Sequence, residues 1–565
     1  MRKNKKRSTA FLLTLFLFLG IGYAFLRTEL KINGTATIKD ASWNIYFDNL
    51  VVNDDSVEIL TGNSAASISS NKTEVTYAIT LKEPGDFYEF TVDAVNAGSI
   101  NGMVDVVTSK MNNVDLTELP AYLEYSATYI DGSPIRTHHL LQAGESKKIK
   151  VRIGFRKNIT SNDLPGSALT NSFSFSIVYI QADNEAIPVN PTRPCTYEGN
   201  LVQGAEYQEG QYTYRYKQMV EGVYNQATDS YPSQWINMDG DGWGVVLSDK
   251  NSTDPVTTEL CTTINDKPII SMTRMFYESK TTSIDTTSFN TSNVTSMKSM
   301  FEGTTNLATV DLTTFNTSNV TDMGYMFKNS SITSFDLSSF NTSKVESMTY
   351  MFSNIHVDAM NINNFDVSNV LDISGLLSGA SFSTLKLPRD LDLRKATNIG
   401  TMFQSITYDH LDLSNMITRD ATDMSYMFQS STIGELILPN DWDVRKVKTM
   451  RGTFYALNTP SIDLSGMKTR DVTDFHIMFT YSTAKSIIFS ENFVTNKVTD
   501  MNNMFQNVPI EGTLDISNFS IDSLIEKTNM FYNCGASTVL VKSDAIRSEF
   551  MNGTGKPSGM TITVK

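Results

Sequence analysis

Hydrophobic and polar residues alternate in the first third of the chain. The segment KKIKVRIGF at 147–155 alternates apolar residues with lysine and arginine, and SFSFSIVY at 172–179 alternates large residues with smaller ones. Such alternation is typical of half-buried strands. EVTYAITL at 74–81 and FYEFTVDAVNAG at 87–98 predict two more strands, separated by an EPGD turn. The pattern therefore predicts an antiparallel β-sandwich over residues 27–182.

A longer period begins near residue 263. The phrase FNTSNVTSMKSMF at 289–301 returns as FNTSNVTDMGYMF at 315–327. Its final residue recurs at gaps of 25 or 26 positions, at Phe276, Phe301, Phe327, Phe352, Leu377, Phe403, Phe428, Phe454, Phe479, Phe505 and Phe531. A period of about 20–29 residues predicts a leucine-rich-repeat solenoid. We expect about 11 coils of 25–26 residues over 263–542, with Leu377 marking a degenerate unit.

Each repeat has two halves with different hydrophobic periods. LATVDLTTF at 307–315 has the LxxLxLxx arrangement of a short strand, whereas NVTSMKSMF at 293–301 places apolar residues at helical spacing. Polar pairs three residues apart look like helix caps: Asn319 with Asp322, Asn369 with Asp372, Asp420 with Asp423, and Asp471 with Asp474. The prediction is an α/β solenoid in which strands form one side, short capped helices form the other, and stacking buries the apolar faces.

Residues 183–262 predict a linker followed by a small β module. EYQEGQYTYRYK at 206–217 is typical of a hairpin that turns at Glu209 and Gly210. Cys195 and Cys261 bracket this module, so an oxidising compartment favours a disulfide between them. The third cysteine, Cys534, is expected to be a small buried hydrophobe. Residues 543–565 follow the repeats as a C-terminal cap.

The N-terminus indicates export. Five cations within the first seven residues precede an uncharged run at 8–26, the order of a secretory signal. Small residues at Gly22 and Ala24 favour cleavage after Ala24, although the run is nearly long enough to remain as a membrane anchor. Residues 1–26 are therefore a signal peptide or an N-terminal anchor, and the protein is expected outside the cell or on its surface.

Charge and motif content exclude several function classes. The formal charge is −15, which argues against nucleic acid as a partner. No GxSxG, HExxH or phosphate loop is present, so we expect no enzyme activity and no cofactor.

NMDGDGWG at 237–244 imitates a calcium loop but has Ser248 where a bidentate Glu is needed. His138 and His139, on a presumed strand, lack a third ligand, so no metal site is expected. The many Met residues of the repeats are interpreted as core.

The strand half of the repeats carries the candidate binding residues. In the x-L-D-L pattern the acid lies between two inward residues and therefore points outward: Asp285, Asp311, Asp336, Asp412, Asp463 and Asp515. Asn361, Lys386, Ile437 and Ile488 take this place in other coils. The acids could simply be solvated by neighbouring Ser and Thr hydroxyls, or they could form a stripe for a cation or a basic partner. The strand side is expected to be concave, because helices would form the bulkier side. Replacement of Asp311, Asp336 and Asp412 together by Ala is expected to leave the melting temperature nearly unchanged while weakening adhesion. Replacement of Lys298 on the other side is expected to affect neither.

Two parts of the chain resemble known families. LATVDLTTFNTSNVTDMGYMF at 307–327 and ITSFDLSSFNTSKVESMTYMF at 332–352 resemble the BspA-like leucine-rich-repeat surface proteins of bacteria and their 26-residue surface-protein repeat. The usual Asn of the ninth repeat position is instead Phe315, Phe340, Phe365 or Trp442, which predicts an aromatic spine. LKINGTATI, the Trp43 strand and VNAGSING resemble the camelysin-type and matrix β-sandwich proteins of Gram-positive bacteria.

The resemblance implies a secreted or surface adhesin. Its solenoid would engage an extracellular protein or glycan, on a host or on another bacterium, and only residues 8–26, if uncleaved, would contact a membrane. A structural role remains open as the alternative, in which the N-terminal sandwich assembles matrix or fibre subunits.

Overall fold

The computed structural model describes residues 42–565 apart from 57–64, 113, 116–119, 121, 134, 157–170, 183–191 and 227–229. The predicted signal or anchor at 1–26 lies outside this described part. Within it, no helix is both long and apolar enough to cross a membrane.

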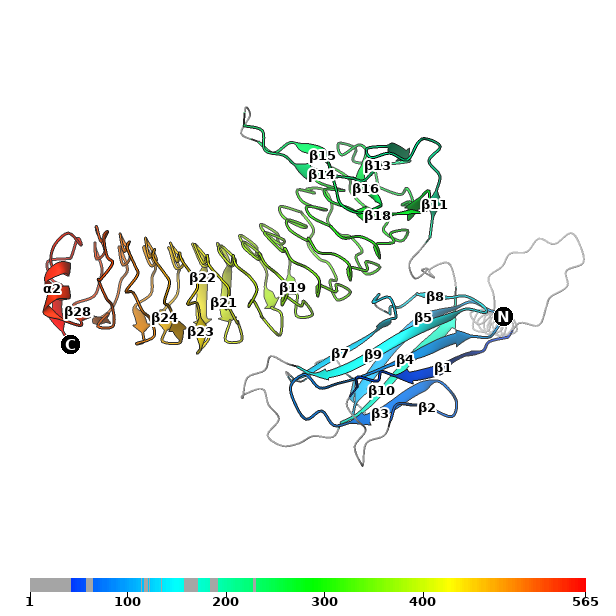
Figure 1. The fold of residues 1–565 in the computed structure, drawn as a ribbon, viewed down its shortest axis with the longest axis horizontal. Coiled ribbons are helices and arrows are strands. Elements are labelled where there is room, and N and C mark those ends of the chain that lie inside the picture. The colour runs from blue at the N-terminus through cyan, green and yellow to red at the C-terminus, as the bar shows by residue number, and fades with distance from the viewer. Residues whose placement is uncertain are drawn as a thin grey trace, which may run out of the picture. The chain divides into compact units, whose positions relative to one another are not determined.

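Residues 45–181 form an antiparallel sandwich of two sheets (Figure 1). One sheet has the order β1 (Ile45–Val52), β4 (Phe87–Asn96), β9 (Ser146–Phe155), β7 (Leu123–Tyr129). The other has the order β2 (Ser67–Ile68), β3 (Glu74–Ile79), β10 (Asn171–Gln181), β5 (Gly102–Met111), β6 (Val114–Asp115), and β8 (Leu140–Leu141) pairs with β5. All four strands predicted from alternation are confirmed.

The alternating residues of the sandwich strands meet between its sheets. Ile149, Val151 and Ile153 of β9 face Phe173 and Phe175 of β10 in one buried core. The lysines and arginine between them on β9 are only partly buried or exposed. The expected strand at His138 is wrong, because His138 has φ +65° and lies in a turn before β8.

A small β module follows the sandwich. It comprises β11 (Pro194–Cys195), β12 (Glu206–Glu209), β13 (Tyr212–Tyr216), β14 (Gln218–Gly222), β15 (Ser233–Asn237), β16 (Trp243–Leu247), β17 (Thr263–Ile264) and β18 (Lys267–Ser271). The predicted hairpin is β12–β13, and its turn requires Gly210, which has φ +52°. Tyr212, Tyr214 and Trp243 are buried in a core that continues into the repeats.

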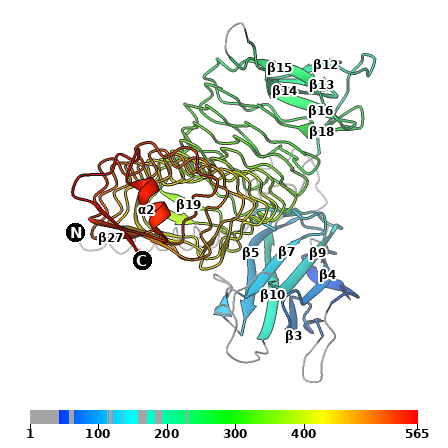
Figure 2. The ribbon, with the colours of Figure 1, turned by 60° about the vertical axis from the view of Figure 1, so that its left-hand side comes forward.

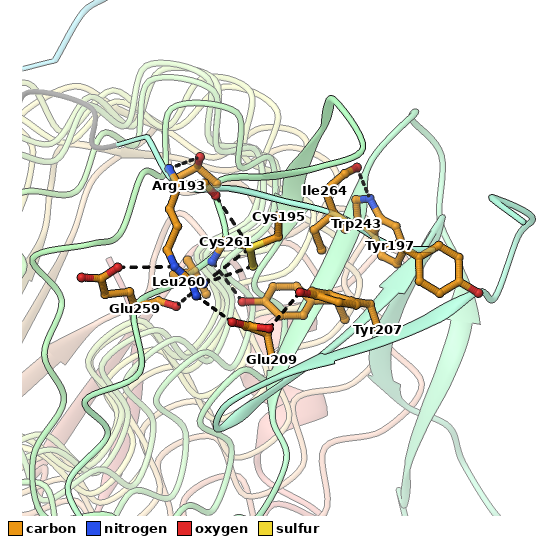
Figure 3. Close-up of a disulfide and its surroundings, with 12 residues drawn as sticks. Arg193, Cys195, Tyr197, Tyr207, Glu209, Trp243, Glu259, Leu260, Cys261 and Ile264 are labelled. Atoms are coloured by element: carbon orange, nitrogen blue, oxygen red, sulfur yellow. Dashed lines mark hydrogen bonds and ion pairs between the residues drawn. A yellow bond between two sulfur atoms is a disulfide. The ribbon is translucent and has the colours of Figure 1, made fainter. Parts of the chain in front are cut away.

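The structure contains the expected disulfide between Cys195 and Cys261, whose Cα atoms lie 5.8 Å apart (Figure 3). The parallel pair β11–β17 brings the two cysteines together. Arg193 lies beside the sulfurs, and its Nη2 forms an ion pair with Glu209 at 2.7 Å. Cys534 is a buried free thiol whose pKa is raised by burial.

The repeats form a β-solenoid of about 13 turns. Its coils stack side by side, and neighbouring coils pair through short parallel strands (Figure 1). These strands are β19 (Ala359–Asn361), β20 (Thr384–Lys386), β21 (Thr407–Asp412), β22 (Thr432–Ile437), β23 (Trp442–Asp443), β24 (Ser461–Leu464), β25 (Met467–Lys468), β26 (Ser486–Phe489), β27 (Thr513–Asp515) and β28 (Thr538–Val541).

The second half of each coil is not helical, which corrects the α/β leucine-rich-repeat prediction. Among the described residues the one α-helix is α2 (Asp544–Phe550), which follows the last coil. In place of each predicted helix, the chain makes consecutive turns in which two residues, four positions apart, have positive φ. The pairs are Arg274/Glu278, Ser299/Gly303, Tyr325/Asn329, Tyr350/Asn354, Gly375/Gly379, Thr401/Ser405, Tyr426/Ser430, Gly452/Ala456, Ile477/Tyr481, Asn503/Asn507 and Asn529/Asn533. A right-handed helix cannot pass through such residues.

Hydrogen bonds to the next coil stabilise this turn conformation. Alternate N–H groups donate to carbonyls one coil ahead: Met323 to Ser347 at 3.0 Å, Tyr325 to Thr349 at 2.7 Å, Phe327 to Met351 at 3.0 Å and Asn329 to Ser353 at 2.9 Å. The intervening Met326 N–H instead closes a turn on Met323 at 3.2 Å. In every pair except Asn529/Asn533, each strained residue therefore gains a bond between coils that a helix would not provide.

The predicted helix caps form other contacts. Asp322, Asp372, Asp423 and Asp474 each accept the N–H of the residue two positions ahead, at 2.8–2.9 Å. This short-range bond is the Asx-turn, with which Asp competes against helix formation. The first residue of each pair accepts a hydrogen bond from a lysine of the next coil: Asn319 from Lys344, Asn369 from Lys395, Asp420 from Lys446 and Asp471 from Lys497. The hydrogen bond from Lys497 lowers the pKa of Asp471 to about 2.

The interior consists of columns of identical side chains, as expected. The rings of Phe301, Phe327 and Phe352 stack at 5.6–5.7 Å. From Phe403 to Phe531 the stack continues at 5.4–5.9 Å, and Leu377 separates the two stacks. The methionines of the repeat lie beside these rings and are buried, which confirms their interpretation as core.

A buried row of threonines explains the repeated N-T-S phrase. The Thr317 hydroxyl donates to the Asn341 carbonyl of the next coil at 3.0 Å and accepts the Asn341 N–H at 2.8 Å. Equivalent hydroxyls donate to the next coil from Thr291, Thr342, Thr418, Thr469 and Thr495. The expected aromatic spine is also present as buried Phe315, Phe340, Phe365 and Trp442. Buried threonine hydroxyls thus satisfy backbone groups of the next coil.

Thr317→Val is expected to destabilise the solenoid by about 1–3 kcal/mol, because the N–H and C=O of Asn341 each lose their partner on the buried Thr317 side chain while side-chain shape is kept. Thr317→Ser should restore most of the loss. The control is Thr321→Val on the same coil, where an exposed hydroxyl bonds one carbonyl at 3.2 Å. Chemical denaturation compares the variants, and equal stabilities of Thr317→Val and Thr321→Val would contradict the role of the buried row.

The last coil is covered by a cap. Strand β29 (Thr561–Val564) pairs with β28, and α2 lies across the end of the coil (Figure 2). Ser543 caps α2 by accepting the Ile546 N–H. Phe550 of α2 packs edge-on against Phe531 at 5.8 Å, so the ring stack ends on an aromatic side chain rather than in water.

Candidate binding surface on the strand side of the solenoid

The candidate site is the strand face, which we define as the outward side chains of the strand half of each coil. One row consists of Asp285, Asp311, Asp336, Asn361, Lys386, Asp412, Ile437, Asp463, Ile488 and Asp515. A second row, two residues earlier, consists of Thr309, Ser334, Ala359, Thr384, His410, Glu435, Ser461, Ser486 and Thr513. Most members of both rows are exposed, whereas most residues between them are buried. The alternation expected from the sequence therefore places the six predicted acids on one face.

Each predicted acid has a local structural contact. Asp311 Oδ1 accepts the N–H and the hydroxyl of Thr313, at 2.8 and 2.6 Å. Asp285 contacts Thr287 in the same way. The other four accept the N–H two residues ahead, at 2.8–3.0 Å: Asp336, Asp412, Asp463 and Asp515. These Asx-turns close the end of each strand, so Asp→Ala would remove a turn contact, contrary to the expected unchanged stability.

Part of the carboxylate nevertheless stays available to a ligand in acids such as Asp311 and Asp412. Asp311 accepts the Thr313 hydrogen bonds on Oδ1, and Asp412 accepts the Ser414 hydrogen bond on Oδ1. Asp515 differs, because its Oδ2 forms an ion pair with Lys565 at 2.6 Å. Burial alone would raise the pKa of Asp515, but the hydrogen bonds from Lys565 and Ser517 outweigh it and lower that pKa. Both carboxylate oxygens of Asp515 thus form contacts within the protein.

The chemistry of the strand face changes along the solenoid. The first coils present Asp and hydroxyl groups, and the middle coils add Lys386 and the pair His410 Nδ1 and Glu435 Oε2 at 2.8 Å. Sequence reasoning missed this pair, although a spacing of 25 residues equals one coil and could have revealed it. Toward the C-terminus, acids alternate with Ile437 and Ile488, and Ile488 is 48 % exposed. No group of three or more metal-ligating side chains is present among the described residues.

The absence of helices also changes the expected shape of the coils. Concavity of the strand side was expected because helices would form a bulkier opposite side. The turn half has no such layer within residues 271–535. Without a bulkier helical layer opposite the strands, there is no longer this reason to expect a concave strand side.

These features define the class of protein as a repeat protein built on a β-solenoid with an exposed polar sheet face. Four overlapping segments of the solenoid match a family described as "Mycoplasma protein of unknown function, DUF285": residues 270–387, 354–435, 384–488 and 434–543. The solenoid is thus similar to a bacterial repeat family whose function is unknown. No curated protein and no solved structure matches the chain.

Proposed function

We propose that this chain is a bacterial cell-surface or secreted binding protein, of the BspA-like kind, that engages an extracellular protein or glycan through the strand face. The observation that carries the proposal is a contrast within single strands. The outward position is Asp311, Asn361, Lys386 or Ile437 in different coils, whereas the residues on both sides of it are apolar in each case. A constant interior with a varied outer row can present different contacts along one rigid face.

Two further features support an extracellular role. A disulfide such as Cys195–Cys261 persists in oxidising compartments. The net charge of −15 suits a self-repelling surface protein and disfavours nucleic acid as the ligand. No catalytic constellation is needed for this role, and none is proposed.

A structural function is the second candidate, and one observation favours it. On the outer face of the sandwich, Val106 of β5 and Val178 of β10 are cross-strand partners that are 45 % and 47 % exposed. Ile180 extends this apolar patch at 39 % exposure. Exposed apolar side chains on a sheet are suited to contacts between subunits of a matrix or fibre.

The two functions are separated by a binding experiment with the full chain. The protein is screened against immobilised extracellular-matrix proteins, glycans and whole bacteria, and a captured ligand is then tested with the triple variant Asp311→Asn, Asp336→Asn, Asp412→Asn. Asn keeps the Oδ1 acceptor of the Asx-turn and removes only the charge. We expect an almost unchanged melting temperature and weaker binding, which raised salt should mimic if the ligand is cationic.

The matched control is Glu346→Gln, an exposed charge on the flank of the coil away from the strand face. It should bind like the wild type. If the triple variant bound as well as the wild type, the acids of the strand face would not be the binding site. That result would favour the structural function of the sandwich.

A further inference from the structure

Two cations lie together on the turn side of the first coil. Arg274 occupies the first positive-φ position of that coil and is only 8 % exposed. Its Nη1 donates to Ser233 Oγ of strand β15 at 2.7 Å, while its Nε is buried without a hydrogen-bond partner. Its guanidinium lies 4.0 Å from the ring centroid of Tyr277.

Lys250 shares the surroundings of Arg274. Its Nζ donates to the Arg274 carbonyl at 3.0 Å and lies 5.5 Å from the same Tyr277 ring. Burial, and then the charge of Arg274, lower the pKa of Lys250 to about 8. Two cationic groups therefore face one aromatic ring, and their proximity disfavours the charged form of the lysine.

Neither cation has an ion-pair partner among the carboxylates of residues 192–226 and 230–565. Neighbouring cations do: Lys298 pairs with Glu221 at 3.2 Å and Lys328 with Glu302 at 3.6 Å. Glu278 is the carboxylate that raises the pKa of Lys250, but it lies beyond ion-pair distance. A buried charge without an opposite charge is costly, and this chain has an excess of acids that could have supplied one. No carboxylate therefore lies within ion-pair distance of either cation, although the charge of Glu278 acts on Lys250.

We propose that Arg274 and Lys250 form a binding site for a phosphate or sulfate group. Arg274 Nε and the remaining Nζ protons of Lys250 are the unused donors, and charge-assisted bonds from arginine and lysine are those that oxyanions favour. Lys250 is partly exposed, so an anion can reach it from solvent, whereas the buried Arg274 Nε would contact that anion only after a shift of the Arg274 side chain. The site lies on a different side of the coil from the strand face, so it does not depend on the proposed function.

The test is calorimetric titration of the full chain with inorganic phosphate, with sulfate and with glycerol phosphate, against chloride at matched ionic strength. We expect saturable binding of one anion per chain, weakened at least about tenfold by Lys250→Gln and by Arg274→Gln, since each removes a charge-assisted donor. Preference for glycerol phosphate over phosphate would indicate an esterified ligand, and the reverse a free ion.

Lys298→Gln is the matched control, because this neighbouring cation already has a carboxylate partner. Its ion pair argues against the expectation that a change of Lys298 leaves stability untouched, but Lys298→Gln should bind anions like the wild type. Arg274 also holds the β14–β15 hairpin through Ser233, so circular dichroism checks whether Arg274→Gln folds. If it does not, Lys250→Gln decides alone.

A second measurement does not depend on any variant. Acetic anhydride at pH 8 should acetylate Lys250 readily, because its pKa is near 8, and a bound anion should raise that pKa and slow the reaction. Peptide mass spectrometry compares Lys250 with exposed lysines of the same sample. No saturable binding beyond that of chloride, or unchanged binding by Lys250→Gln, would overturn the proposal, and so would acetylation of Lys250 that phosphate and sulfate leave unchanged.

Discussion

A chain that lacks residues 302–327 is expected to fold, with one coil fewer and an otherwise unchanged solenoid. The deletion joins Phe301 to Lys328, so every inward column, the buried threonine row and the turn hydrogen bonds keep their register. Coils contact mainly their neighbours, so the loss should lower stability without abolishing cooperative unfolding. Circular dichroism and thermal melting measure both properties.

The comparison is a chain that lacks only 302–313. This deletion places the strand half of one coil against the turn half of the next, so inward Phe and Leu residues meet outward polar residues. We expect no cooperative melting transition. Equal damage from the two deletions would show that the coil is not the independent unit of this fold.

Phe327→Ala is expected to destabilise the protein by about 3–5 kcal/mol, because it leaves a cavity inside the solenoid. Phe327 is fully buried and stacks on Phe301 at 5.6 Å and on Phe352 at 5.7 Å, so both neighbours also lose a ring contact. Urea denaturation monitored by circular dichroism measures the change.

The chain itself supplies the control substitution. Leu377 occupies the same row and is fully buried, so Phe327→Leu should cost only about 1–2 kcal/mol. If Ala and Leu at position 327 were equally destabilising, the loss would come from the missing ring stack rather than from the cavity. If both were harmless, the column would not be a source of stability.

The sequence predicts the period, the inward residues and the outward acids of the solenoid, because all three follow from spacing alone. It does not predict the conformation of the turn half. Apolar residues at Met297, Met300 and Phe301 point inward both in a helix and in the observed turns, so hydrophobic spacing cannot distinguish the two. Gly or Asn two residues after the Phe, as at Gly303, Asn329 and Asn354, was the available signal for positive φ.

The contacts of the candidate sites were harder to predict. The outward direction of Asp311 follows from strand alternation, but its bond to Thr313 depends on where the strand ends. Arg274 and Lys250 come together because a loop after β16 and the β14–β15 hairpin both pack on the first coil. No local pattern of residues encodes such packing between distant segments.

The substitution of Leu377 for a Phe has a mechanical consequence. If the solenoid were stretched along its axis, each junction between coils would carry the same load. The junctions on either side of Leu377 lack the ring contact that most of the others have, so rupture should begin there. The array would then separate into two shorter stacks, each with its own ring column intact.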